Sequence, residues 1–166
     1  YLNADVSEAE GQFVRAGFDP EKDLFRSAVL QGADGEARRT FDYGEDINLV
    51  VRTNPKSKEK FGLEVRLKNS RGDILGYSSS WLDRAGTQVY EPGDTIAVGL
   101  KGAALTEDTY ILDLIARMPK LYHVDNWWDG ISFEVGLCKP EGSPFVLRAD
   151  DQIGNVVLRD VSFRRA

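Results

Sequence analysis

The sequence contains one histidine, one cysteine and no long hydrophobic run, and each shortage excludes a class of protein. One histidine and one cysteine are too few for a classical zinc site, so we expect no metal. Cys138 has no second cysteine with which to form an internal disulfide, which is compatible with a reducing compartment. No stretch of the sequence approaches the about 18 consecutive apolar residues of a membrane-spanning helix.

Positive charge and catalytic motifs are also scarce. The formal net charge of −6 argues against a nucleic-acid partner, because phosphate binding needs a basic surface. The sequence has no phosphate-binding loop, no dinucleotide fingerprint and no nucleophile elbow. A Ser–His–Asp triad would have to use His123, and nothing in the sequence marks its partners. We therefore expect a non-catalytic binding module that has no cofactor.

What the sequence does contain is a series of short strand patterns. Apolar residues alternate over 47–51 and 63–67, which is the period of a half-buried strand. Strand patterns also cover 24–30, 74–81, 95–100, 109–117, 131–138 and 156–164. Turn residues recur about every 8 to 12 positions, and no amphipathic helix is predicted. The pattern predicts an all-β fold, an antiparallel β-sandwich of immunoglobulin-like or jelly-roll type with about eight or nine strands.

The N-terminal end of the chain departs from this pattern. Residues 1–22 are polar and acidic, and we expect them to form a linker or an N-terminal arm before a sandwich over 23–166. The chain begins at Tyr1 rather than at methionine, so we also expect a fragment of a longer protein.

Aromatic and polar groups concentrate in the stretch from Thr109 to Cys138. Both ends of this stretch have strand patterns, and we interpret 118–130 between them as a loop. That loop contains two of the three tryptophans, the only histidine and two aspartates. Because rigid scaffolds commonly present binding residues on loops, we expect binding residues near this end of the fold.

Several short motifs occur in an order that resembles a known family. In chain order they are Phe41-x-x-Gly44-x-x-Ile47, Asn69-x-x-Gly72-x-Ile74-x-Gly76, Pro92-Gly93-Asp94-x-Ile96, Tyr110-x-Leu112 and Asp125-x-x-x-Asp129-Gly130-Ile131-Ser132-Phe133-Glu134-Val135. Over roughly 23–138 this series resembles the C-terminal O-antigen-binding domain of the ATP-binding subunit of O-polysaccharide ABC exporters, the Wzt family.

The resemblance implies a carbohydrate-binding domain that recognises the non-reducing terminus of a lipid-linked O-antigen polysaccharide before export. Such a domain would be cytoplasmic, appended to an ATPase and peripheral to the inner membrane through the exporter's ATPase and transmembrane subunits. The missing phosphate-binding loop would then belong to an ATPase domain that this chain lacks. The resemblance also implies a homodimer in which 145–166 forms a strand exchanged between the two subunits.

Saccharides present hydroxyl groups and apolar C–H faces, so their binding sites pair aromatic rings with charged or amide side chains. Three places compete for this role: the strand over 77–81, the outward face of the central strands, and the loop over 122–128. The candidate ligand-binding residues are Tyr77, Ser79 and Trp81, then Arg66, Asp113 and Arg117, and finally His123, Trp127 and Trp128. The outward face also carries Glu64 and Lys68.

Each of these groups has a structural alternative. Trp81 would then belong to the core, Asp113 and Arg117 would form ion pairs on a solvated face, and one of the two adjacent tryptophans would close an end of the sandwich. Two other functions also stay open. One is an immunoglobulin-like protein–protein adaptor with tryptophan hot spots, and the other is a jelly-roll enzyme that cleaves a polysaccharide.

Overall fold

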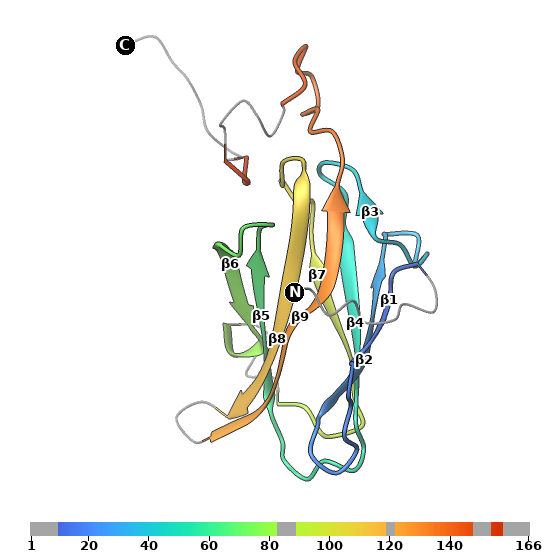
Figure 1. Ribbon diagram of the computed structural model, residues 1–166. Helices are drawn as coiled ribbons and strands as arrows, with labels where there is room; N and C mark the ends of the chain where they lie inside the picture. The colour runs from blue at the N-terminus through green and yellow to red at the C-terminus, as the bar shows by residue number, and fades with distance from the viewer. Residues whose placement is uncertain (1–9, 83–88, 119–121, 148–153, 158–166) are drawn as a thin grey trace.

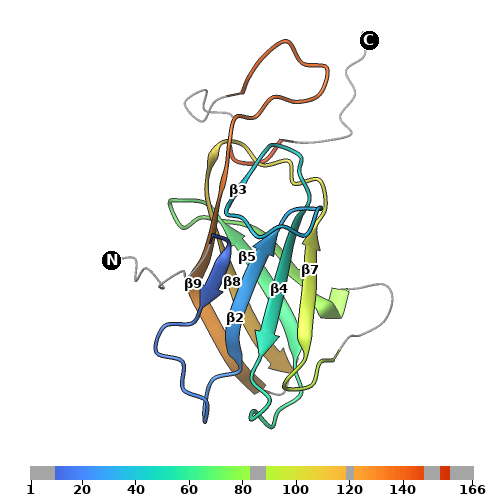
Figure 2. The same ribbon diagram turned by 90° about the vertical axis from the view of Figure 1, so that its right-hand side faces the viewer.

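The computed structural model describes residues 10–82, 89–118, 122–147 and 154–157, which form two packed β-sheets (Figures 1 and 2). The first sheet, sheet A, contains in order β1 (Gln12–Val14), β2 (Phe25–Gln31), β4 (Ile47–Thr53) and β7 (Thr95–Leu100). The second sheet, sheet B, contains in order β3 (Thr40–Phe41), β9 (Tyr122–Val135), β8 (Asp108–Met118), β5 (Gly62–Lys68) and β6 (Ile74–Ser79). Only the short β3–β9 pair is parallel among these strands. The predicted all-β sandwich is confirmed.

The core lies between the sheets because alternate side chains of each strand point inward. On β4, Ile47, Leu49 and Val51 are buried, and the residues between them are half-buried. On β8, the ring of Tyr110 is fully buried and stacks on Phe133 of β9, with ring centroids 5.5 Å apart. Among the described residues, no helix is long and apolar enough to cross a membrane.

The strand β9 passes through residues that the sequence predicts to be a loop. It begins at Tyr122 and pairs with β8 along most of its length, so the predicted loop over 118–130 is wrong. A bulge hides the alternation. Leu112 and Leu114 of β8 face Ile131 and Trp127, so the single residue between the two leucines lies opposite the three residues 128–130. Residues 119–121 lie outside the described part of the chain.

The two ends of the chain also differ from the expected domain plan. Gln12–Val14, which we expected within a linker or arm, form β1 on β2, and the side chain of Phe13 is buried. Beyond β9, Asn155 lies against the start of β8, where its side chain donates to Asp108 at 2.8 Å. Most of the segment expected to be exchanged, 148–153 and 158–166, lies outside the described residues, as do 1–9.

The side chain of Asp125 connects the two sheets. Its Oδ2 accepts hydrogen bonds from the backbone N–H groups of Leu24 at 2.8 Å and Phe25 at 2.9 Å. The same oxygen accepts from the guanidinium of Arg15 at 2.5 Å, and Arg15 also donates to the carbonyl of Asn126 at 3.0 Å. This one carboxylate on β9 therefore anchors the beginning of β2 and the segment that follows β1.

We expect Asp125→Ala to lower the free energy of unfolding by about 2–4 kcal/mol, because two buried N–H groups and a guanidinium lose their acceptor. Urea denaturation followed by tryptophan fluorescence measures the change. Glu21→Ala is the control, since it removes an exposed ion pair with Lys56 at 2.9 Å and should change stability little. Equal losses in the two variants would contradict the anchoring role.

Candidate functional site

The side of sheet B that faces away from the core gathers most of the predicted site residues. Arg66 on β5 lies between two cross-strand neighbours, Tyr77 on β6 and Asp113 on β8. Glu64 and Lys68 lie two positions before and after Arg66, so their side chains project from the same face of β5. Three adjacent strands therefore present charged and aromatic side chains on one surface, which we call the outer face.

Lys68 brings two carboxylates together on the outer face. Its Nζ lies 2.8 Å from Oδ2 of Asp113 and also donates to Oδ1 of Asp129. The backbone N–H of Asp129 donates to Oδ1 of Asp113 at 3.0 Å, so both carboxylate oxygens of Asp113 are engaged. Burial by itself lowers the pKa of Lys68, but hydrogen bonds and charge attraction from the two aspartates outweigh this effect and raise its pKa above the ordinary value. Lys68 therefore remains a cation.

The bulge in β9 turns Trp128 and Asp129 onto the outer face. Asp129 has a φ of 56°, a left-handed conformation that aspartate tolerates better than most residues. Gly130 leaves room for the neighbouring indole, since a Cβ there would lie 1.8 Å from Nε1 of Trp127. As a result Trp127 is 4% exposed and packs in the core, whereas Trp128 is 46% exposed.

Trp128 also contacts a cation of the neighbouring strands. The guanidinium carbon of Arg66 lies 5.6 Å from the centroid of the Trp128 ring, which is within the range of a cation–π interaction. Tyr77, the cross-strand neighbour of Arg66, is 51% exposed. We call this group the open cluster. Its members are Arg66, Lys68, Tyr77, Asp113, Trp128 and Asp129.

A second polar group on the outer face is covered by its own side chains, and we call it the closed group. It consists of Glu64, Ser79, Trp81 and Arg117. Trp81 follows β6 in a short 3-10 helix, η1 (Ser80–Leu82), and its indole lies where a Cβ of Gly62 would be, 2.1 Å from Nε1. Arg117 is the cross-strand neighbour of Gly62, and its Nη2 lies 2.7 Å from Oε2 of Glu64. Glu64 is buried, and Nε1 of Trp81 and Nε of Arg117 are buried without a hydrogen-bond partner in the described part of the protein. Trp81 thus packs over the strand backbone and is neither a core residue nor a freely exposed platform.

The nine predicted residues fall into four environments. Four of them, Arg66, Tyr77, Asp113 and Trp128, belong to the open cluster. Ser79, Trp81 and Arg117 lie with the closed group, where Ser79 is buried beside Glu64. Trp127 packs in the core, and His123 is exposed opposite Arg117 near the start of β9.

Asp129 is the site residue that the sequence analysis missed. The Asp-Gly pair at 129–130 suggests a simple turn. In the structure, Asp129 instead sits inside a strand and reaches Lys68 on a strand two positions away. Lys68 and Asp113 were both expected on the outward face, but the contact between Lys68 and Asp129 was not, because it depends on the bulge in β9.

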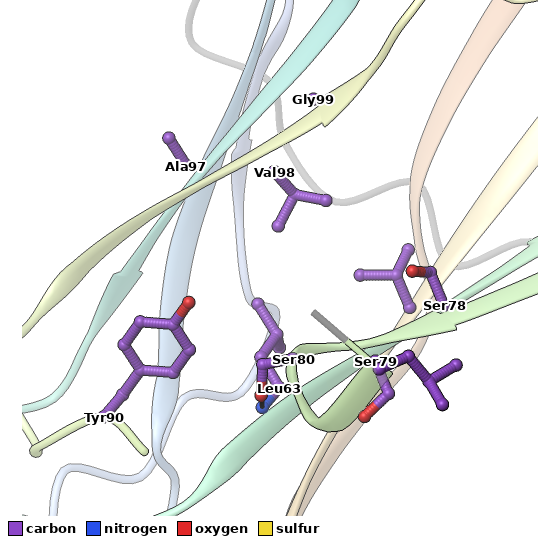
Figure 3. Close-up of a pocket in the computed structure, with 10 residues that line it drawn as sticks. Leu63, Ser78, Ser79, Ser80, Tyr90, Ala97, Val98 and Gly99 are labelled. Carbon is purple, nitrogen blue, oxygen red and sulfur yellow. Dashed lines mark hydrogen bonds between the residues drawn. The ribbon is translucent and has the colours of Figure 1, made fainter. Parts of the chain in front are cut away.

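A cleft opens between the edge strands β6 and β7, on the core side of sheet B (Figure 3). It has a volume of about 300 Å³, and Leu63, Tyr90 and Val98 contribute to its walls together with Ser78 and Ser80. None of the described residues that line it is charged. The part of the chain that the structure describes also contains no group of three or more His, Cys, Asp or Glu side chains placed to hold a metal ion. Ionic and aromatic groups suited to a polar ligand therefore occur together on the outer face rather than in this cleft.

We expect Lys68 and Asp113 to stabilise the fold as a coupled pair. Lys68→Met should lower the free energy of unfolding by about 3 kcal/mol, because Asp113, whose side chain is 3% exposed, would lose its cation. Asp113→Asn should have a similar cost, and the double variant should cost about 1–3 kcal/mol less than the sum of the two. Urea denaturation of the four proteins measures the coupling. The exposed pair Lys60–Glu91 is the matched control and should show no measurable coupling, so equal values for both pairs would contradict the network.

Comparison with known proteins finds a similar architecture among solved structures, but no match from sequence. No protein-family model matches the sequence, and no curated protein matches it either. Among solved structures, the crystal structure of the C-terminal domain of Wzt superposes with a TM-score of 0.62 at 15% sequence identity, over 96% of this chain and 90% of that chain. At this identity the likeness concerns the fold, and the resemblance predicted from the motifs is confirmed at that level: the chain has the β-sandwich fold of the Wzt C-terminal domain.

Proposed function

We propose that this chain is a non-catalytic carbohydrate-binding domain that recognises the non-reducing terminus of a lipid-linked O-antigen polysaccharide for export by an ABC transporter. The open cluster is its glycan site. The observation that carries the proposal is the exposed Trp128 ring beside the Arg66 guanidinium, on the outer face of a sandwich with the fold of the Wzt C-terminal domain.

The chemistry of the open cluster suits a sugar. The exposed rings of Trp128 and Tyr77 offer apolar surfaces for the C–H face of a pyranose. Arg66 supplies several N–H donors for hydroxyl groups, and the carboxylate of Asp129, whose side chain is 59% exposed, supplies acceptors. All of these side chains project from paired strands, so little conformational entropy is lost when a ligand binds.

The state of the carboxylates favours binding over cleavage. Glycoside hydrolysis commonly uses two carboxyl groups, one of which donates a proton to the leaving oxygen. On the outer face, both oxygens of Asp113 are engaged by Lys68 and a backbone N–H, and Glu64 is buried beside Arg117. Neither side chain is placed as a free acid or base for a bound sugar. Asp129 is then the single exposed carboxylate of the open cluster, which argues against the two-carboxyl mechanism of a jelly-roll enzyme.

In this proposal the domain acts in the cytoplasm, at the inner membrane, together with the ATPase and transmembrane subunits of the exporter. The support is the likeness in fold to the C-terminal domain of Wzt. Glycan binding by such a domain would couple completion of the polysaccharide chain to its export.

We also propose that two copies form a homodimer in which the C-terminal segment, 145–166, is exchanged. The support is a pair of open edges: among the described strands, β6 pairs only with β5, and β7 pairs only with β4. An open edge offers unpaired N–H and C=O groups to an added strand. Val157, Val161 and Phe163 occupy alternate positions of this segment, with Arg159 interrupting the apolar series, and such a pattern is compatible with an added strand.

Binding to lipopolysaccharide O-chains tests the proposed function. The purified domain should retain the O-chains of its own source strain and not those of a strain with another serotype. Trp128→Ala should weaken this binding by about tenfold or more, with little loss of thermal stability, because an exposed stacking surface is removed. Its neighbour Trp127 is the matched control, since Trp127→Ala should lower the thermal stability of the core. Trp81→Ala, tested in the same assay, asks whether Trp81 also contacts the glycan, as the sequence predicts. A loss of binding would support that contact.

Two results would contradict the glycan site on the open cluster. Full retention of cognate O-chains by Trp128→Ala would place the contact elsewhere. Retention of neither O-chain by the unmodified domain would favour the protein–protein adaptor, in which exposed Trp128 and Tyr77 would act as interface hot spots.

The proposed strand exchange predicts a change of assembly on truncation. Sedimentation equilibrium should give a dimer for the full chain and a monomer for a variant that ends at Val157. The variant should keep a far-ultraviolet circular dichroism spectrum typical of β-structure, which separates loss of assembly from loss of folding. A truncated protein that remains a dimer would contradict exchange of this segment.

A further inference from the structure

Three carboxylates of the outer face on β5, β8 and the bulge of β9 have a cationic partner among the described residues. Glu64 is paired with Arg117 at 2.7 Å, and Asp113 and Asp129 share Lys68. In each pair the positive charge of the cation offsets the negative charge of the carboxylate at short range. None of the three carboxylates is left over to neutralise a further cation.

Arg66 is the cation that this arrangement leaves without a carboxylate. Its cross-strand neighbour on β8 is Asp113, but both oxygens of Asp113 are engaged by Lys68 and by the N–H of Asp129. Among the described residues no carboxylate lies within ion-pairing distance of the Arg66 guanidinium, which instead contacts the ring of Trp128. Arg66 is also half-buried, so part of its hydration is lost without replacement by an anion.

We propose that Arg66 selects a sugar residue that carries an anionic group, a carboxylate or a phosphate. The inference rests on the proposed glycan-binding function and names the chemistry that the open cluster prefers. A planar guanidinium donates two parallel hydrogen bonds to a carboxylate or a phosphate, and such charge-assisted bonds are stronger than those to a neutral hydroxyl. Trp128 and Tyr77 beside Arg66 then hold the sugar ring that carries the anion.

The nearby group of Lys68, Asp113 and Asp129 carries one net negative charge and would repel an anion. That repulsion acts over a longer distance than the direct contact with Arg66, and Coulomb energy falls with distance. Water and salt at the exposed carboxylate of Asp129 weaken it further. The direct contact therefore decides the preference.

A nuclear magnetic resonance titration of the full chain tests this selection with three probes: glucuronate, glucose 6-phosphate and glucose. Each of the three tryptophans contributes one indole N–H signal, so Trp128 is its own reporter. We expect at least one of the acidic probes to shift the Trp128 signal at about tenfold lower concentration than glucose does, because of the charge-assisted contact. Comparison of the two acidic probes shows whether carboxylate or phosphate is preferred.

Three variants identify the residue responsible. Arg66→Gln should reduce the response to the acidic probes to the level of glucose, and Arg66→Lys should keep part of the preference because it keeps the charge but loses the planar fork. Arg52→Gln is the matched control, since Arg52 is an exposed arginine on β4 of the opposite sheet and its loss should leave the titrations unchanged.

Equal responses of Trp128 to all three probes would overturn the selection by Arg66 and leave the glycan-binding proposal standing. An acid preference that survives Arg66→Gln would also overturn it. If none of the probes shifts the Trp128 signal up to its solubility limit, both the selection and the glycan site on the open cluster are overturned.

Discussion

The pairing of β8 with β9 is the constraint on which the rest of the structure depends. The inward side of this pair supplies large buried groups such as Tyr110, Leu112 and Phe133, which close the core against sheet A. The outward side supplies Asp113, Trp128 and the other groups of the candidate site. A slip of one residue would move every side chain to the opposite face, so the apolar inward series fixes where the outward polar groups lie. Fold and site are two faces of one strand pair.

The bulge in β9 supplies a hydrogen-bond donor to the buried carboxylate of Asp113, and that carboxylate in turn stabilises the bulge. An isolated carboxylate this deeply buried would be costly, and Lys68 together with the N–H of Asp129 compensates that cost. That N–H points at Asp113 only because the bulge places Asp129 opposite it with a positive φ. A regular β9 would leave Asp113 with one fewer donor and would not present Trp128 in the same way. The charged network therefore favours this register over competing ones and adds specificity to the hydrophobic core.

Period-two alternation made the sandwich and much of the outer face predictable. It placed Arg66 and Lys68 on one face of β5, and Tyr77 on a neighbouring strand, where the structure has them. It could not separate Trp127 from Trp128, since only the bulge and the side-chain space at Gly130 decide which indole enters the core. The short β1 escaped notice because three residues are too few for a period to be recognised. Pairings between distant segments, such as Asp129 with Lys68, have no local signature at all.

The likeness to the C-terminal domain of Wzt at 15% identity follows from the same division of faces. Inward positions need only to be apolar and of suitable volume, so a sandwich tolerates wide changes of sequence while its strands keep their order. Outward positions are under no such constraint from the core, and they are free to change with the ligand. In this chain they include a bulged tryptophan and an arginine without a carboxylate partner in the described part of the face. Because the fold is compatible with many outer faces, the proposed ligand has to be argued from these side chains rather than from the fold.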